Sequence, residues 1–264
     1  MDEKLTIKQI KSLKTKKGRD ALNLFIVEGE KFVAEIPTEN FKIVAFVCTE
    51  SKLYLVDKFL EREIQIIKVS DKYFSGISDT VTPQGIMAVC EKRTFALSNI
   101  LGNLQNGQKN PKPNFLLLLE NIADPGNLGT LIRTAAAAKV QAVILSTGCC
   151  DIYNPKVIRA AAGAFFRVPI VDNADFTEVI PQLQQNGTNI VATSLQAKNL
   201  AYDINLCESC GILIGNEANG LSQQVLNLAN LSVKLPMFNN VESLNAATAG
   251  GILLYEVVRQ RLEK

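Results

Sequence analysis

Three segments of the sequence place polar side chains among small residues in a pattern that could bind a ligand or assist a reaction. The first begins at Glu120 and holds Asn127, Thr130 and Arg133. These three residues lie off an apolar stripe of helical spacing, near the start of a predicted helix. The Arg133 guanidinium is a planar fork suited to a phosphate or a hydroxyl group. An ordinary helix, with Asn127 as its N-cap and Arg133 on its surface, explains the segment equally well.

The second segment, Leu213 to Ser222, is a glycine-rich turn after a predicted strand. Its spacing matches the phosphate-binding pattern GxxxxGK[ST], but Leu221 occupies the position of the lysine. This substitution disfavours a nucleotide-binding hydrolase. The turn can still bring backbone amides close to a flat ligand at Gly215 and present the Glu217 carboxylate. A solvated glutamate on a simple glycine turn is the alternative interpretation.

The third segment, Leu235 to Asn245, precedes a long predicted helix that ends near Leu262. Helix capping alone could explain Ser243 and Asn245. Two polar residues this close, after a strand and a proline, nevertheless exceed what a helix start requires. The predicted apolar face of the helix consists of Leu244, Ala247, Gly251, Leu254, Val258 and Leu262.

The composition removes several kinds of chemistry. The chain contains no histidine, so a Ser-His-Asp triad, a Cys-His pair and a histidine general base are excluded. Cys207 and Cys210 form one CxxC pair, but a zinc site needs two further ligands, and we expect no metal. The six cysteines of a chain this long are expected to be reduced rather than a disulfide framework.

The elements that must position the three segments are buried parallel strands. Ligands bind beyond the carboxyl ends of such strands in open α/β sheets, which is where these segments begin. Continuous apolar runs with helical patterns between them predict a parallel sheet covered on both faces. The predicted strands are 115–119, 142–146, 167–171, 189–194, 211–214 and 231–235.

A polar stretch from Gly102 to Asn114 predicts a linker between two α/β domains, residues 1–103 and 113–264. In the smaller, N-terminal domain we expect a helix over 51–62. The predicted strands of that domain are 25–27, 43–48, 64–69 and 86–90.

The net charge of +2 says little about partners, but its distribution says more. Residues 1–19 hold seven basic and two acidic residues, which suits phosphate contacts or simply a solvated helix. The apolar run Phe115 to Leu119 is far shorter than the roughly 20 residues of a membrane span. The first 17 residues lack the apolar core of a secretory signal, so we expect a cytoplasmic protein without membrane contact.

Together the three segments resemble the SpoU/TrmH family of RNA ribose methyltransferases, in the knotted SPOUT class. The matching motifs are NLGTLIR (127–133), GNEANGLS (215–222) and LPMFNNVESLNAATAGG (235–251), in the family's order. Three N-terminal motifs resemble the ribosomal-protein-like RNA-binding domain of one branch: IKSLKTKKGR (10–19), FIVEGEK (25–31) and TPQG (82–85). The resemblance therefore covers nearly the whole chain and favours RNA as the partner of the basic N-terminus.

This resemblance implies transfer of a methyl group from S-adenosyl-L-methionine to a ribose 2′-hydroxyl of structured RNA, with 23S ribosomal RNA expected first. Transfer RNA as substrate, or a noncatalytic RNA-binding or assembly protein on the same fold, are the alternatives. The resemblance also implies a trefoil knot in the C-terminal domain, an exception to the general rule that protein chains do not thread through their own loops. A homodimer is expected, with the helix start Ala246 to Gly251 as an interface element.

The resemblance carries site roles to particular positions. The expected cofactor-binding residues are Gly215, Leu235 and Leu244, which would act largely through backbone, and Thr193 at a neighbouring strand end. The expected catalytic residues are Asn127, Arg133, Glu217, Ser243 and Asn245.

The catalytic residues differ in what their chemistry allows. Because a guanidinium stays protonated, we expect Arg133 to bind a phosphate and stabilise a developing alkoxide rather than act as a base. The proton would pass to a phosphate oxygen, to solvent or to Glu217. Ser243 and Asn245 would orient substrate or cofactor, and Asn127 would fix Arg133 or the ribose.

One position departs from the family pattern. Asn239 occupies a place where these proteins commonly have glycine. Asparagine tolerates left-handed backbone better than most residues, so we expect the turn to be kept.

Overall fold

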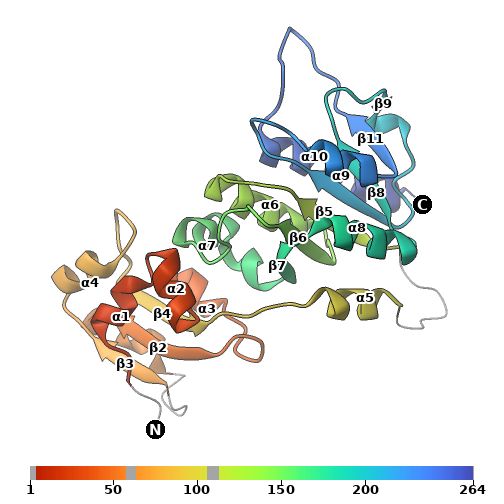
Figure 1. The fold of residues 1–264 in the computed structure, drawn as a ribbon. Helices are drawn as coiled ribbons and strands as arrows, with labels where there is room; N and C mark the ends of the chain where they lie inside the picture. Colours follow the sequence, from red (N-terminus) through yellow and green to blue (C-terminus); the bar gives the residue numbers. More distant parts are fainter. Residues whose placement is uncertain (1–3, 58–63, 106–112, 264) are drawn as a thin grey trace. The chain divides into compact units, whose positions relative to one another are not determined.

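The computed structural model describes residues 4–57, 64–105 and 113–263. The chain divides into two compact units (Figure 1). The N-terminal unit comprises Met1–Arg93 and Asp151–Phe166, and the C-terminal unit comprises Thr94–Cys150 and Arg167–Lys264. The segment Asp151–Phe166 therefore packs with the N-terminal unit, although it lies inside the sequence range expected for the second domain.

The N-terminal unit is a small α/β domain, as predicted. Its four-stranded sheet has the order β1-β4-β2-β3, in which β2 and β3 are parallel and the other pairs antiparallel. The strands are β1 (Leu24–Glu28), β2 (Ile43–Cys48), β3 (Gln65–Lys68) and β4 (Ile86–Glu91). The α-helices are α1 (Ile7–Ser12), α2 (Lys16–Leu22), α3 (Glu30–Ala34), α4 (Asp71–Ile77) and α7 (Pro155–Ala161).

The helix predicted over 51–62 is wrong in its described part. A short 3-10 helix, η1 (Glu50–Leu55), occupies this segment, and residues 58–63 lie outside the described part of the chain. None of the residues in η1 is buried. Because most helix stability comes from packing an apolar face, this segment gains little from a longer helix.

Aromatic side chains and one buried ion pair join the segment 151–166 to the rest of the N-terminal unit. The rings of Tyr153 and Phe165 lie 4.7 and 6.0 Å from that of Phe25. Arg19, only 2% exposed, donates through Nε to Asp151 Oδ2 over 2.8 Å. Arg19 therefore holds the unit together and does not belong to the accessible positive charge of the N-terminus.

The C-terminal unit contains the predicted parallel sheet. Its seven strands are all parallel to their neighbours, in the order β7-β6-β5-β10-β8-β11-β9. The strands are β5 (Phe115–Leu119), β6 (Ala142–Ser146), β7 (Ile170–Ala174), β8 (Asn189–Thr193), β9 (Asn199–Leu200), β10 (Cys210–Ile214) and β11 (Leu231–Lys234). The strand predicted at 167–171 begins and ends three residues before β7, and β9 was not predicted. The trefoil knot stays a prediction.

Helices cover both faces of this sheet. The α-helices are α5 (Leu97–Gln105), α6 (Pro125–Ala137), α8 (Phe176–Gln185), α9 (Gln223–Leu228) and α10 (Ala246–Leu262), and η4 (Ala201–Asp203) is a 3-10 turn. Leu213 of β10 belongs to a core cluster with residues of α5, α8 and α9. Its neighbour Ile214 faces the other way, toward α10. The first part of the predicted linker is helical, because α5 continues to Gln105, and 106–112 lie outside the described residues.

The final helix begins and ends where predicted, but its apolar face is displaced. Leu254 is buried as expected, whereas Leu262 is 81% exposed. Gly250 rather than Gly251 faces the core, since a Cβ at Gly250 would lie 2.4 Å from Leu131 of α6. The bare backbone at Gly250 thus lets α10 cross α6 closely. No helix among the described residues is long and apolar enough to cross a membrane.

Candidate active site

Three of the four residues expected to hold the cofactor lie at the carboxyl ends of three adjacent strands. Thr193 ends β8, Gly215 follows β10, and Leu235 follows β11. These strands are neighbours in the sheet, in the order β10-β8-β11. The Thr193 hydroxyl donates to the Leu213 carbonyl over 3.1 Å, which ties two of these strand ends together. This edge is where an open parallel sheet binds its ligand.

Three of the expected catalytic residues meet in one hydrogen-bonded group, which we call the polar cluster: Asn127, Glu217 and Asn245. The Nδ2 of Asn127 donates to Glu217 Oε1 over 2.6 Å. The Nδ2 of Asn245 donates to Asn127 Oδ1 over 2.9 Å. An ionised carboxylate only accepts hydrogen bonds, so Glu217 fixes which end of the Asn127 amide faces it. The structure thus joins the three segments that the sequence singled out.

Helix capping explains why Asn127 and Asn245 can make these bonds. Asp124, not Asn127, is the N-cap of α6: its Oδ1 accepts from the Asn127 backbone N–H over 2.7 Å. The alternative interpretation, with Asn127 as the cap, is therefore wrong, and the Asn127 side chain remains available for Glu217. Asn245 caps α10 through Oδ1, which accepts from Ala247 N, and keeps its Nδ2 for Asn127.

Glu217 lies on the glycine loop, which we define as Gly215–Ser222. Asn216 and Gly220 exchange two backbone hydrogen bonds of 3.1 and 2.9 Å and close the loop on itself. A Cβ at Gly215 would lie 2.3 Å from the carbonyl carbon of Gly220, so only glycine fits there. The side chain of Asn216 donates to the Asn121 carbonyl over 2.8 Å. The loop is therefore a built hairpin rather than a loose turn.

The sequence analysis did not single out Glu120, which is bonded to the end of this loop. Glu120 follows β5 and is only 6% exposed. Its carboxylate accepts from the Ser222 backbone N–H over 2.8 Å and from the Ser222 hydroxyl over 2.7 Å. An acidic residue directly after a fully buried apolar strand was the available signal.

The remaining expected catalytic residues are not joined to the polar cluster. Arg133 is exposed on α6 and makes no hydrogen bond or ion pair with any residue that the structure describes. Arg133 lies six helical positions after Asn127, a rise of about 9 Å along the axis. Ser243 is exposed and Leu244 half-buried in the extended segment between β11 and α10 (Figure 1).

The turn in that segment has the expected backbone. Asn239 and Asn240 have φ angles of 54° and 57°. Both lie in the left-handed region, which asparagine tolerates at low cost. The left-handed backbone expected at Asn239 is therefore present, and equivalence to the family's glycine turn stays a prediction.

The residues at the strand ends fit an adenosyl group. Gly215 adds no side chain at this edge of the sheet, and buried Leu235 and half-buried Leu244 supply apolar side chains for a base. The polar cluster supplies amide and carboxylate groups at the same edge. Among the described residues, no group of three or more His, Cys, Asp or Glu side chains could hold a metal ion.

The cysteines show no sign of activation. Burial raises the pKa of the Cys149 thiol. Burial also raises the pKa of Cys210 to about 11. Both thiols are therefore protonated at neutral pH and poor nucleophiles.

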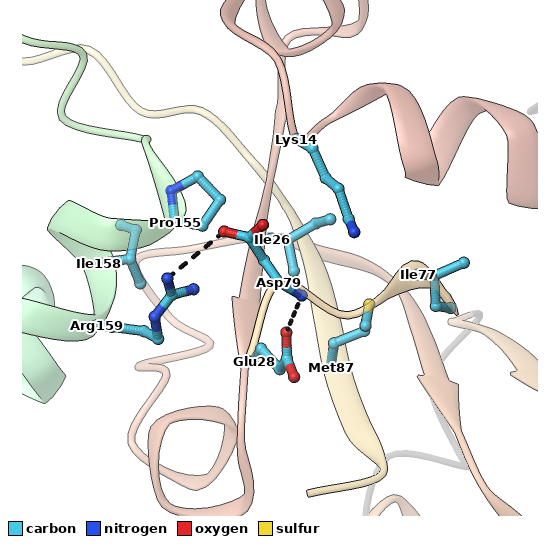
Figure 2. A pocket seen from close by; sticks show the side chains of 9 residues that line it. All are labelled: Lys14, Ile26, Glu28, Ile77, Asp79, Met87, Pro155, Ile158 and Arg159. Carbon is cyan, nitrogen blue, oxygen red and sulfur yellow. Dashed lines mark hydrogen bonds and ion pairs between the residues drawn. The ribbon is translucent and has the colours of Figure 1, made fainter. Parts of the chain in front are cut away.

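A small cavity lies within the N-terminal unit and contains none of the expected site residues (Figure 2). The Asp79 backbone N–H donates to Glu28 over 3.3 Å, and the Asp79 carboxylate pairs with Arg159 over 3.5 Å. Thr80 also donates to Glu28, over 2.8 Å. These charged groups bond to one another, so they join β1, the loop before β4 and α7.

Two family models match the chain. The model of the SpoU rRNA Methylase family matches residues 114–255. The model of the MRM3-like substrate binding domain matches residues 4–88. The first range includes every residue of the strand-end site, and the second covers most of the N-terminal unit.

Relatives of known name are similar over most of the chain. The 23S rRNA (guanosine(2553)-2'-O)-methyltransferase RlmP of Bacillus subtilis is 34% identical, over 95% of this chain and 95% of its own. The 23S rRNA (guanosine-2'-O-)-methyltransferase RlmB of Xanthomonas campestris is 31% identical, over 75% of this chain and 79% of its own. Among solved structures, the AdoMet-bound rRNA methyltransferase of Sinorhizobium meliloti has a TM-score of 0.84 and 30% identity. It covers 96% of this chain and 93% of its own.

Proposed function

The chain belongs to the SpoU rRNA Methylase family, and we propose that it methylates a ribose 2′-hydroxyl of 23S-type ribosomal RNA with S-adenosyl-L-methionine as donor. The observation that carries this proposal is the polar cluster. It brings one side chain from each of the three segments together at the carboxyl edge of the sheet. A decayed, noncatalytic relative would have no reason to keep all three.

The donor supplies a methyl group already activated on a sulfonium, so the protein's task is to place a ribose oxygen and to assist loss of its proton. Glu217 suits the second task, because Asn127 holds only its Oε1. Glu217 Oε2, a phosphate oxygen or solvent then receives the proton. Asn127 orients Glu217 through this bond, and Asn245 orients Asn127.

Arg133 binds a phosphate of the RNA and stabilises the developing alkoxide. Its guanidinium stays protonated and offers a planar fork of donors. That it bonds to no described residue leaves all its donors for the substrate. Ser243, exposed two positions before Asn245, is assigned to substrate or cofactor orientation.

We propose that the enzyme acts as a homodimer. Because Arg133 lies away from the polar cluster in this chain, a second copy could bring the two together. Along α10, Tyr255 is 52% and Leu262 81% exposed, and Gly251 is half-buried. An apolar stripe of this kind suits a self-complementary interface. A molar mass equal to that of one chain, measured by light scattering at micromolar concentration, would contradict this assembly.

The N-terminal unit binds the RNA in this proposal. Lys4, Lys8, Lys11 and Lys17 are exposed, whereas Arg19 is buried in its ion pair with Asp151. Exposed lysines bind phosphates with an affinity that falls steeply as salt rises. We divide the sequence into a substrate-binding domain, residues 1–103, and a methyltransferase domain, residues 113–264. Within these ranges, 94–103 belong to the C-terminal unit, and Asp151–Phe166 pack with the N-terminal unit. We propose that the protein is cytoplasmic, because the relatives RlmP and RlmB are bacterial 23S rRNA methyltransferases.

The direct test is methyl transfer from labelled donor to purified RNA. We expect incorporation into a 23S rRNA transcript and its loss when the target ribose is a 2′-deoxyribose. Guanosines are the first targets to map, since two relatives are named for guanosine. Labelling of tRNA and not of 23S rRNA would show that transfer RNA, the alternative, is the substrate. Donor binding without transfer to any RNA would contradict the enzymatic proposal.

A further inference from the structure

We propose that Glu120 is a positioning residue for the glycine loop, and through that loop for Glu217 and the cofactor edge. The inference rests on the proposed function and extends it to a residue outside the predicted site. Glu120 touches neither Asn127 nor Glu217 by any hydrogen bond among the described residues. It acts through Ser222, at the far end of the loop.

Glu120 and Asn121 bond to the chain just before the loop, to the second residue of the loop and to its last residue. The Glu120 backbone N–H donates to the Ile214 carbonyl over 2.8 Å, just before the loop begins. The Asn121 carbonyl accepts from the side chain of Asn216 over 2.8 Å. The Glu120 carboxylate accepts both donors of Ser222 at the loop's end. Two consecutive residues after β5 thus fix the whole hairpin.

The chemistry of the far anchor is specific. An ionised carboxylate offers two acceptor oxygens, and Ser222 presents two donors, its backbone N–H and its hydroxyl. Such charge-assisted bonds offset the cost of burying Glu120. An apolar side chain would fill the same space without that cost, but it would not determine where Ser222 lies. Position, rather than stability alone, is what this carboxylate supplies.

The position of Ser222 matters because of how the loop is built. Asn216 and Gly220 close the hairpin internally, so it moves as one piece about its two ends. Gly215, at the near end, packs against the backbone of Gly220 and Leu221, so a shift at Ser222 is transmitted to it. Release of Ser222 would therefore swing Glu217 away from the Asn127 amide and alter the backbone beside the cofactor.

The test compares Glu120→Ala and Glu120→Gln with a matched control, Thr188→Val. Thr188 accepts from buried Asn114 over 3.0 Å, so this control also removes a buried polar bond. Asn114 and Thr188 precede β5 and β8, at the opposite edge of the sheet from Glu120. The control therefore loses stability without touching the loop. Glutamine accepts at one oxygen only, so Glu120→Gln keeps part of the anchor.

Three readouts separate positioning from stability: donor Kd by calorimetry, kcat and KM for the RNA, and amide hydrogen exchange of 215–222. Even when Glu120→Ala and Thr188→Val lower Tm by the same amount, Glu120→Ala is expected to weaken donor binding about tenfold or more. This is the effect of one charge-assisted hydrogen bond. Glu120→Ala is also expected to lower kcat with little change in the KM for RNA and to speed exchange in the loop. Glu120→Gln is expected to fall between wild type and Glu120→Ala, and Thr188→Val to change only Tm.

If Glu120→Ala does not fold, Ser222→Ala removes the hydroxyl half of the anchor. Asp175→Ala, which removes the cap of α8 in the same unit, controls for the cap that Ser222 gives α9. Donor Kd and loop exchange that match those of the control variants would overturn the inference. This failure is distinct from that of the proposed function, in which the wild-type protein itself would transfer no methyl group.

Discussion

Asn245 donates a hydrogen bond of 2.9 Å to Asn127, although 118 positions of the sequence separate them. The same Asn245 caps the long C-terminal helix α10 with its other amide atom. The cap fixes Asn245 at the helix start, and this fixed amide then orients Asn127 toward Glu217. The Asn245 side chain therefore both caps a helix and makes a contact in the candidate active site.

Replacement of Asn127 should lower the rate of methyl transfer. Asn127→Ala removes the donor that holds Glu217 and is expected to cost about tenfold to a hundredfold in kcat. Asn127→Asp should be worse, because it places a second carboxylate against Glu217. Asn227→Ala, which removes an exposed amide hydrogen bond with Gln223 on α9, is the control. Equal single-turnover rates for Asn127→Ala and Asn227→Ala would exclude a role for the Asn127 contact.

Arg133→Lys should reduce kcat/KM by about a hundredfold, the loss typical for one donor to a developing negative charge. Lysine keeps the charge but not the planar fork. Since Arg133 is exposed, its replacement should leave Tm within a degree or two of the wild-type value. Near-normal turnover of Arg133→Lys on a 23S rRNA transcript would show that a point charge suffices.

Gly250→Ala should destabilise the C-terminal unit by about 1–3 kcal/mol, because a Cβ there would overlap Leu131 and Ile214. Gly102→Ala, in helix α5, is the control: a Cβ there would meet no atom within 4 Å. Denaturant unfolding measures both. Equal stability of the two variants would contradict the close crossing of α10 over α6.

The buried ion pair of the N-terminal unit should matter more than a surface pair. Asp151→Asn leaves the Arg19 guanidinium buried without its counter-charge and should cost about 3–5 kcal/mol. Lys16→Ala breaks an exposed pair with Asp20 and should cost less than about 1 kcal/mol. The thermal unfolding of the N-terminal unit, measured for both variants, checks this prediction. A small effect of Asp151→Asn would mean that 151–166 is not part of that unit's core.

Much of the fold was predictable because its signals are local. Continuous apolar runs such as Phe115–Leu119 and Ala142–Ser146 are strands with the predicted ends. The final helix also begins and ends as predicted, since its start and stop depend on residues next to it in the chain. One local signal was misread: Pro125 at the first helical position marks Asp124, not Asn127, as the cap.

The sequence by itself therefore determined the parallel sheet, the three strand-end segments and the kind of chemistry they could support. Only the tertiary structure decided which side chains meet. Glu120 and Ser222 lie 102 positions apart, and nothing in the sequence near either residue indicates the other. The packing of β10 between β5 and β8 brings their loops together. Caps and periodicity depend on chain neighbours, whereas these contacts exist only once distant strands have paired.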